Sequence, residues 1–216
     1  MSRQAVIRLT DAGDREDAGA FVARTVRMDG QALVRLRNSP SRPAHPEPRL
    51  QLWATTPFDA LVTRSVSGVV DPPDVTVHAA NLLPGIAVAR STDVDPGPVV
   101  DALWHTQLPP LAGWSLVDTV PAAVIADLIA TGSESARENV SPAGGTATAL
   151  LDAQVLTVSG SGYTVVVPMR CLFALSGMGF AGDADVRVLA TDAWLRLDAQ
   201  FGAVVRRRHS LLPLLF

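Results

Sequence analysis

The clearest local signal in this chain of 216 residues is the stretch Phe21-Val22-Ala23-Arg24-Thr25-Val26-Arg27-Met28-Asp29-Gly30-Gln31-Ala32-Leu33-Val34-Arg35-Leu36-Arg37-Asn38. Its two halves are rich in β-branched residues, and Asp29-Gly30 between them supplies the positive φ angles of a two-residue turn. The pattern predicts a β-hairpin over residues 21–38.

Pairing outward from that turn places Arg24 opposite Arg35, with Arg37 diagonal to them on the same face. Like charges that face each other across a ladder are mildly destabilising, so we expect an acidic group to offset them. Candidates are a phosphate, an acidic surface of another subunit, or the acidic middle of this chain; Arg206, Arg207 and Arg208 add to the same field. The alternative is that the arginines extend into water over their apolar neighbours. Arg24, Arg35 and Arg37 are the candidate binding residues.

The segments that follow the hairpin extend the β-rich pattern. Four prolines within residues 39–48 predict an exposed loop, and strands resume over residues 50–55 and 60–66. We therefore expect residues 1–90 to form a lobe built on an antiparallel sheet, with a short helix near Val77.

Residues 91–216 read as a mixed helix and hairpin lobe. A short helix is expected between Asp95-Pro96 and Pro109-Pro110, and Pro121 begins an amphipathic helix that Gly132 ends. A helix over residues 146–154, a hairpin over residues 155–167 and a helix beginning at Pro168 follow, with strands over residues 186–189, 194–198 and 203–208. The predicted fold class is α+β, in two lobes that either fold separately or form one cooperative domain.

Composition excludes several classes of protein. All 18 basic residues are arginine, so mechanisms that need a lysine, such as a Schiff base, are not available. No apolar run approaches the roughly 20 residues of a membrane helix. The N-terminus lacks the pattern of a secretory signal, and Cys171 is the only cysteine, so no intramolecular disulfide forms. We expect a reduced, cytoplasmic location and no membrane.

Charge is divided along the chain. The formal net charge is −3, and residues 91–185 hold two arginines against ten acidic residues, whereas the two ends of the chain are mildly basic. A dedicated nucleic-acid binder shows a strongly basic balance, which disfavours that role. Residues 121–180 follow a winged-helix order in outline, but residues 144–154, where a recognition helix would lie, contain no arginine.

The motifs linked to catalysis are weak. Gly177-Met-Gly179-Phe-Ala-Gly182 has the spacing of a dinucleotide-binding turn, yet a helix rather than a strand is expected before it. Two Asp-x-Asp pairs, at residues 93–95 and 183–185, each lack a third carboxylate for a metal ion. The four histidines fall in no ligand or base pattern, and Cys171 has apolar neighbours. The sequence predicts no cofactor, no metal site and no catalytic residue.

Two segments near the end of the chain carry a family resemblance. The segments are Val165-Val-Val-Pro-Met-Arg-Cys-Leu-Phe-Ala-Leu-Ser-Gly-Met-Gly-Phe180 and Trp194-Leu-Arg-Leu-Asp-Ala-Gln-Phe-Gly-Ala-Val-Val-Arg206. Both resemble an uncharacterised family of conserved actinobacterial proteins. The resemblance covers about the last quarter of the chain and implies a bacterial, cytoplasmic origin, with no activity, cofactor or site residue to carry over.

These observations favour a non-enzymatic binding or assembly protein. Its contacts to a protein partner, or to a second copy in a homo-oligomer, would be the arginine-bearing sheet face and the apolar tail Leu211-Leu212-Pro213-Leu214-Leu215-Phe216. Two alternatives stay open: an enzyme whose site is assembled from residues distant in sequence, and a winged-helix-like nucleic-acid binder.

Overall fold

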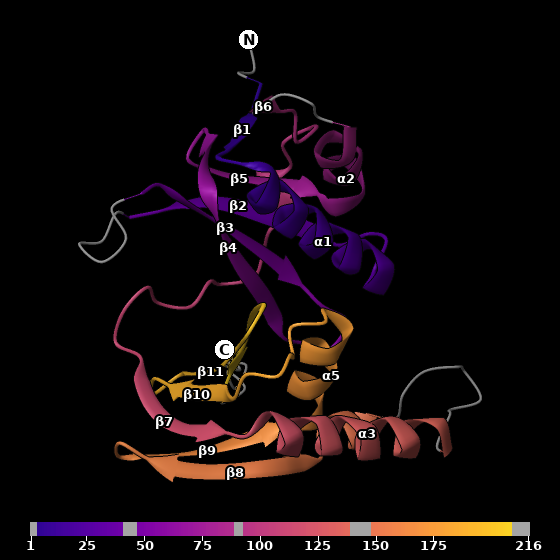
Figure 1. The fold of residues 1–216 in the computed structure, drawn as a ribbon, viewed down its shortest axis with the longest axis vertical. Helices are drawn as coiled ribbons and strands as arrows, with labels where there is room; N and C mark the ends of the chain where they lie inside the picture. Colours follow the sequence, from indigo (N-terminus) through magenta and orange to yellow (C-terminus); the bar gives the residue numbers. More distant parts are fainter. Residues whose placement is uncertain (1–3, 41–46, 89–92, 139–147, 209–216) are drawn as a thin grey trace, which may run out of the picture. The chain divides into compact units, whose positions relative to one another are not determined.

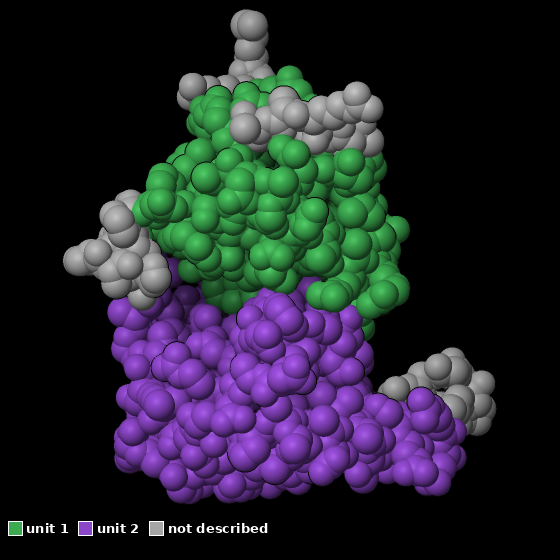
Figure 2. Space-filling view, in the orientation of Figure 1, with its two compact units in different colours: residues 1–57, 61–107 green, residues 58–60, 108–216 purple. Residues whose placement is uncertain are grey.

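The computed structural model describes residues 4–40, 47–88, 93–138 and 148–208 of the chain. The fold is α+β, as predicted. It divides into two compact units: Met1–Pro57 with Leu61–Gln107, and Phe58–Ala60 with Leu108–Phe216 (Figure 2). The composition placed a boundary near residue 90, whereas the first unit continues to Gln107, because Val99 and Val100 form main-chain contacts with its sheet and the Asp101 side chain accepts the Thr76 N–H.

The first unit carries two α-helices and an antiparallel sheet (Figure 1). Its strands run in the order β5-β2-β3-β4-β1-β6. In chain order its elements are β1 (Val6–Leu9), α1 (Ala12–Met28), β2 (Leu33–Ser39), β3 (Arg49–Thr55), β4 (Leu61–Asp71), β5 (Asp74–His78), α2 (Ala79–Val88), β6 (Asp93–Val94) and the 3₁₀-helix η1 (Asp101–Leu103).

The predicted hairpin over residues 21–38 is wrong, because its first half belongs to α1. The side chain of Asp11 caps this helix by accepting a hydrogen bond from the Asp14 N–H at 2.9 Å. Ala18, Phe21, Val22 and Thr25 are buried at helical spacing, which the β-branched residues obscured. Asp29-Gly30 follows the helix end, where the Asp29 N–H donates to the Thr25 carbonyl at 3.0 Å.

The second half of the predicted hairpin is the strand β2, but its neighbours differ from those expected. β2 pairs with β3 and β5. Arg35 therefore lies opposite Trp53 and Thr76, rather than opposite Arg24, which lies on α1. The predicted pairing of the two arginines is wrong, while Arg35 and Arg37 do share one face of a strand.

Two further expectations in the first unit changed. The helix near Val77 begins later, at Ala79, and contains Pro84. The helix expected before Pro109-Pro110 is reduced to the three residues of η1, since residues 99 and 100 are bonded to β5 instead.

The second unit follows the predicted order closely. Its elements are β7 (Ser115–Val120), α3 (Ala122–Glu138), α4 (Thr148–Leu151), β8 (Gln154–Gly160), β9 (Tyr163–Pro168), α5 (Met169–Gly177), β10 (Val186–Ala190), β11 (Trp194–Ala199) and β12 (Gly202–Arg207). The strands β12-β11-β10-β7 form an antiparallel sheet, and β8 and β9 form a separate hairpin. The predicted hairpin over residues 155–167 and the helices that begin after Pro121 and Pro168 are confirmed. The predicted helix end at Gly132 is wrong, because α3 continues through the buried Gly132 to Glu138. The helix expected over residues 146–154 is reduced, within the described residues, to α4.

Each unit has its own apolar core. Phe21, Leu36 and Leu52 are fully buried in the first unit, as are Leu172 and Phe180 in the second. Within the described residues, no helix has the length and hydropathy needed to cross a membrane. The apolar tail over residues 211–216 and most of the proline-rich segment lie outside the described residues.

Candidate functional site

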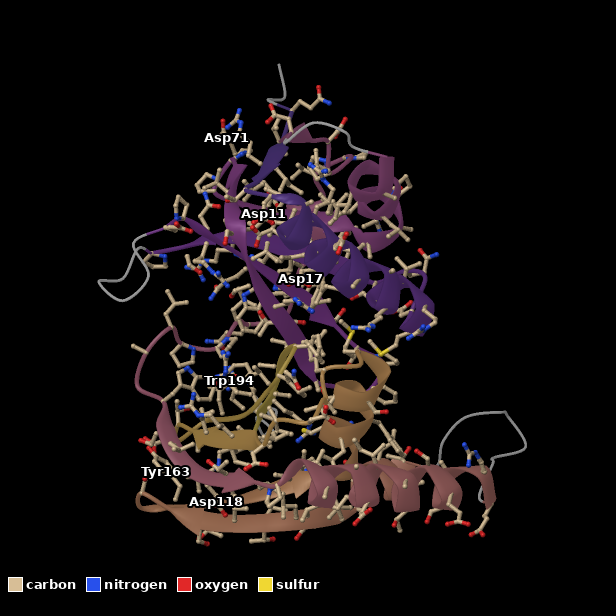
Figure 3. All side chains as sticks on the ribbon, viewed as in Figure 1. Asp11, Asp17, Asp71, Asp118, Tyr163 and Trp194 are labelled. Carbon is tan, nitrogen blue, oxygen red and sulfur yellow. The ribbon has the colours of Figure 1, made fainter. Side chains whose placement is uncertain are left out.

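The strand register defines a polar face on the sheet of the first unit. Arg64 lies opposite Leu52 and forms an ion pair of 2.5 Å with Asp17 of α1, so this side of the sheet is covered by α1 (Figure 3). Arg35 and Arg37 alternate with the buried Leu36 and therefore point to the opposite side.

Three arginines and one aspartate make up this surface, which we call the arginine face: Arg35, Arg37, Arg49 and Asp74. Arg49 lies opposite Ser39 on β3, diagonal to Arg37, and Asp74 lies opposite Arg37 on β5. Their formal charges leave an excess of two positive charges on the face.

Arg35 is the most firmly held of the three arginines. Its Nε and Nη2 donate to the two carboxylate oxygens of Asp74 at 2.7 and 2.8 Å, a bidentate pair that fixes the guanidinium plane. The hydrogen bond to Asp74 raises the pKa of Arg35 above its ordinary value, with smaller contributions from the charges of Asp74 and Asp101, against the opposing effect of burial. Arg35 is thus a fixed positive charge.

Arg37 is held more loosely. Its Nε lies 3.7 Å from Asp74 Oδ2, beyond hydrogen-bonding distance, and 36% of its side chain is exposed. Among the described residues, this is the only ion pair that Arg37 forms, so its terminal nitrogens are left to donate to another group. Arg49 donates instead to the Ser65 carbonyl at 2.9 Å.

A segment of the first unit, which we call the strap (Val99–Trp104), lies against the same surface. Val99 forms a bridge with Val77 of β5, and the Val100 N–H donates to the Thr76 carbonyl at 2.8 Å. Asp101 Oδ1 accepts the Thr76 N–H at 2.6 Å. The ring of Trp104 lies 5.9 Å from the Arg35 guanidinium. The strap therefore places a carboxylate and an aromatic ring near Arg35.

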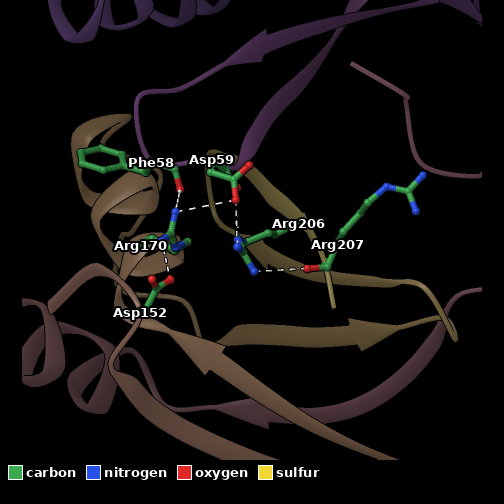
Figure 4. Close-up of polar contacts among 6 residues, drawn as sticks. All are labelled: Phe58, Asp59, Asp152, Arg170, Arg206 and Arg207. Carbon is green, nitrogen blue, oxygen red and sulfur yellow. Dashed lines mark hydrogen bonds and ion pairs between the residues drawn. The ribbon is translucent and has the colours of Figure 1, made fainter. Parts of the chain in front are cut away.

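The second unit contains a polar cluster around a buried arginine (Figure 4). Arg170 on α5 pairs with Asp152, lies 3.7 Å from Asp59 and donates to the Phe58 carbonyl at 3.1 Å. Arg206 on β12 donates to the same Asp59 carboxylate at 2.8 Å. Among the described residues, no group accepts a hydrogen bond from the buried Arg170 Nε, but the other donors of Arg170 and Arg206 bind Asp59 and the Phe58 carbonyl. This cluster therefore holds residues 58–60 within the second unit.

Arginine side chains also lie near aromatic rings of the second unit, one on its larger sheet and one on the β8-β9 hairpin. The guanidinium of Arg207 lies 4.7 Å from the ring of Trp194, and that of Arg208 lies 5.5 Å from the ring of Tyr163. Both rings are labelled in Figure 3. Arg208 also donates to the Thr164 carbonyl at 2.7 Å. The Arg206-Arg207-Arg208 run is therefore bound to groups of its own unit.

Cys171 lies in the core of the second unit. Burial raises the pKa of its thiol to about 12, an effect that the nearby guanidinium groups of Arg206 and Arg170 only reduce. A thiol with this pKa stays protonated near neutral pH and is a poor nucleophile, in agreement with its apolar sequence neighbours.

The weak sequence motifs have structural roles. Helix α5 comes before Gly179, which has a positive φ, so the Gly177–Gly182 run ends a helix. Asp95 accepts hydrogen bonds from the Gln4 side chain and the Gly97 N–H, and Asp185 accepts one from the Ala122 N–H. No group of three or more potential metal ligands occurs within the described residues.

Of the three candidate binding residues, the structure brings Arg35 and Arg37 together on one face and places Arg24 on α1. Sequence reasoning missed Arg49 and Asp74. For Arg49 the available signal was the alternation of Arg49 and Gln51 with Leu50 and Leu52 along β3.

Two protein families match the sequence, one for each unit. Residues 2–106 match the family described as "Domain of unknown function (DUF8010)", and residues 109–211 match "Domain of unknown function (DUF8185)". The limits of these matches agree with the unit boundary at residues 107–108. No curated protein matches the sequence.

Solved structures of bacterial sliding clamps share the fold. The DNA polymerase sliding clamp of Caulobacter crescentus superposes with a TM-score of 0.57 at 16% identity, over 98% of this chain and 67% of the clamp. The clamp of Bacillus subtilis gives a TM-score of 0.58 at 11% identity, over 98% of this chain and 66% of the clamp. The chain thus spans about two thirds of the length of these proteins, and the similarity concerns the fold.

Proposed function

We propose that this protein is a non-enzymatic assembly protein that binds an acidic segment of a protein partner on its arginine face. The observation that carries the proposal is the state of Arg37, whose side chain is 36% exposed and whose terminal nitrogens bind no carboxylate in the part of the chain that the structure describes. Arginine is also among the residues that contribute most to protein interfaces.

The neighbouring contacts prepare the face for an acidic ligand. Asp74 holds Arg35 in one orientation, so its charge is fixed before a partner arrives. Preorganisation of this kind lowers the entropy that is lost on binding. The apolar tail, residues 211–216, provides a second contact in this proposal, because its leucines and Phe216 favour burial against a partner.

The solved structures that share this fold are DNA polymerase sliding clamps, which suggests nucleic acid as a second candidate ligand. The helices of this chain do not favour it. Helix α1 carries three acidic and three basic residues, and α3 carries three acidic residues against Arg137. Phosphate binding requires a surplus of positive charge, so we place protein binding first.

The proposal is tested with immobilised protein at low salt. The wild type, Arg37→Glu and the control Arg137→Glu are each used to capture a partner from the cells that make the protein. The captured partner is then purified and titrated against all three by calorimetry. Arg137 is an exposed arginine of α3 in the second unit and is not part of the arginine face, so Arg137→Glu makes the same charge change at another surface residue.

We expect Arg37→Glu to weaken the titrated affinity by about tenfold or more, and Arg137→Glu to leave it nearly unchanged. Equal affinities of the wild type and Arg37→Glu for the purified partner would contradict the proposal. Loss of binding in both variants would do so as well, because it would show an effect of overall charge.

A further inference from the structure

We propose that the strap is an internal substitute for the partner, and that the partner segment is an extended peptide with a carboxylate followed about three residues later by an aromatic ring. This inference rests on the proposed function, because it concerns the same arginine face. It adds the chemical class of the partner and a mechanism that regulates access to Arg35.

The main chain of the strap is bound as a peptide would be. β5 is the last strand of its sheet on the β2 side, and Val99 forms an antiparallel bridge with Val77 beyond it. The Val100 N–H donates to the Thr76 carbonyl at 2.8 Å. Such addition of a short strand to a free sheet edge is a common way in which proteins bind peptides.

The strap places a carboxylate and an aromatic ring beside Thr76, the residue of β5 that lies opposite Arg35, and beside Arg35 itself. Asp101 accepts the Thr76 N–H at 2.6 Å, and its negative charge contributes to the raised pKa of Arg35. The Trp104 ring lies 5.9 Å from the same guanidinium, within cation–π range. Asp101 and Trp104 are three residues apart, which gives the spacing expected of the partner.

The strap is suited to displacement because few groups hold it. Val99 and Leu103 are 41% and 48% exposed, large values for apolar side chains. Its helical part is the single turn η1. Segments with few buried apolar contacts open at low free-energy cost. A partner peptide that extends along β5 past Arg35 forms more contacts than the strap does, because Arg37 is then within its reach.

The test uses a synthetic peptide with the sequence of residues 97–106, labelled with fluorescein, and fluorescence anisotropy. Its targets are the wild-type protein, the double variant Asp101→Asn/Trp104→Ala, and that double variant with Arg35→Met added. A control peptide carries the same Asn and Ala changes. We expect the double variant to bind the unmodified peptide about tenfold more tightly than the wild type does. We also expect binding to be lost with Arg35→Met and with the control peptide.

A second variant keeps the test decisive if the double variant does not fold. Val100→Pro removes the N–H that donates to Thr76 and leaves the side chains of the strap in place. Circular dichroism establishes that each variant is folded. A folded variant with a weakened strap that binds the peptide no better than the wild type would overturn the inference. The proposed function would survive that result, because it is tested by Arg37→Glu and the captured partner.

Discussion

Gly68 of β4 lies opposite Leu9 of β1, at a point where the two backbones come unusually close. A Cβ on Gly68 would fall 3.2 Å from Leu9 Cα and would overlap the Arg8 carbonyl oxygen. Gly68 also has a φ of 153°, which L-residues with side chains rarely adopt. Glycine is therefore required here for β1 to join the sheet.

We predict that Gly68→Ala destabilises the first unit by about 2 kcal/mol or more, because it combines backbone strain with a steric overlap that no side chain can relieve. Gly30→Ala is the matched control, since a Cβ at Gly30 meets no atom within 4 Å. Urea unfolding followed by hydrogen exchange of peptides from residues 4–88 measures the change. Equal stability of the two variants would show that β1 is not packed as described.

Arg170 gives a prediction for the second unit. Arg170→Met removes the donors to Asp152 and to the Phe58 carbonyl, and only 9% of the Arg170 side chain is exposed. We expect a loss of about 2 to 3 kcal/mol in the free energy of unfolding, because a carbonyl is left without its partner. Arg137→Met, on the exposed surface of α3, should change it by less than about 0.5 kcal/mol in the same urea titration. A loss of equal size in both variants would indicate that Arg170 stabilises the unit no more than a surface arginine does.

The sequence allowed most of the second unit to be predicted, because several of its elements begin at clear signals, although α3 passes through Gly132, where the sequence predicted its end. Pro121 and Pro168 come immediately before helices, and Gly162 lies in the turn between β8 and β9. In the first unit, Val22, Thr25 and Val26 favour a strand locally, but capping by Asp11 and burial of Phe21 place them in a helix. This tertiary effect is not visible in a single window of sequence.

The arginine face was also predictable only in part, because alternation within one strand is visible in the sequence and the pairing of distant strands is not. Alternation along one strand was sufficient to place Arg35 and Arg37 together. Asp74, which offsets their charge, is 37 residues further along the chain than Arg37 and reaches it only through the pairing of β2 with β5. Strand pairing over such distances depends on the whole fold. The spacing of residues in the sequence therefore did not identify Asp74 as the acidic group that offsets the charges of Arg35 and Arg37.

Cys171 predicts how stability depends on pH. Its pKa is about 12 in the folded protein, above the ordinary value of 9.0. Between these pH values the unfolded chain loses the thiol proton and the folded chain keeps it. The contribution of the thiol to the free energy of unfolding is therefore fully present below about pH 9 and is lost as the pH rises toward 12. We expect Cys171→Ala to reduce this decline, although it lowers stability at neutral pH by removing a buried sulfur. Urea unfolding at about pH 8 and about pH 10.5 measures both effects. The same decline in Cys171→Ala would assign it to other groups.

Duplex DNA provides a prediction that distinguishes the two candidate ligands, a protein partner and nucleic acid. The charges of α1 and α3 are balanced or acidic, so we expect no salt-dependent binding to a labelled duplex. Fluorescence anisotropy across a salt series makes the measurement. Tight binding that weakens steeply with salt would favour the nucleic-acid reading over the protein-binding one.

A native mass spectrum of the protein, purified at low salt from the cells that produce it, tests the assembly role most directly. We predict a defined mass above that of the 22.7 kDa chain, from a protein partner or a second copy, and we expect Arg37→Glu to shift the signal to the bare chain. Wild-type protein that is found only as a bare monomer, or a complex that persists in Arg37→Glu, would contradict it.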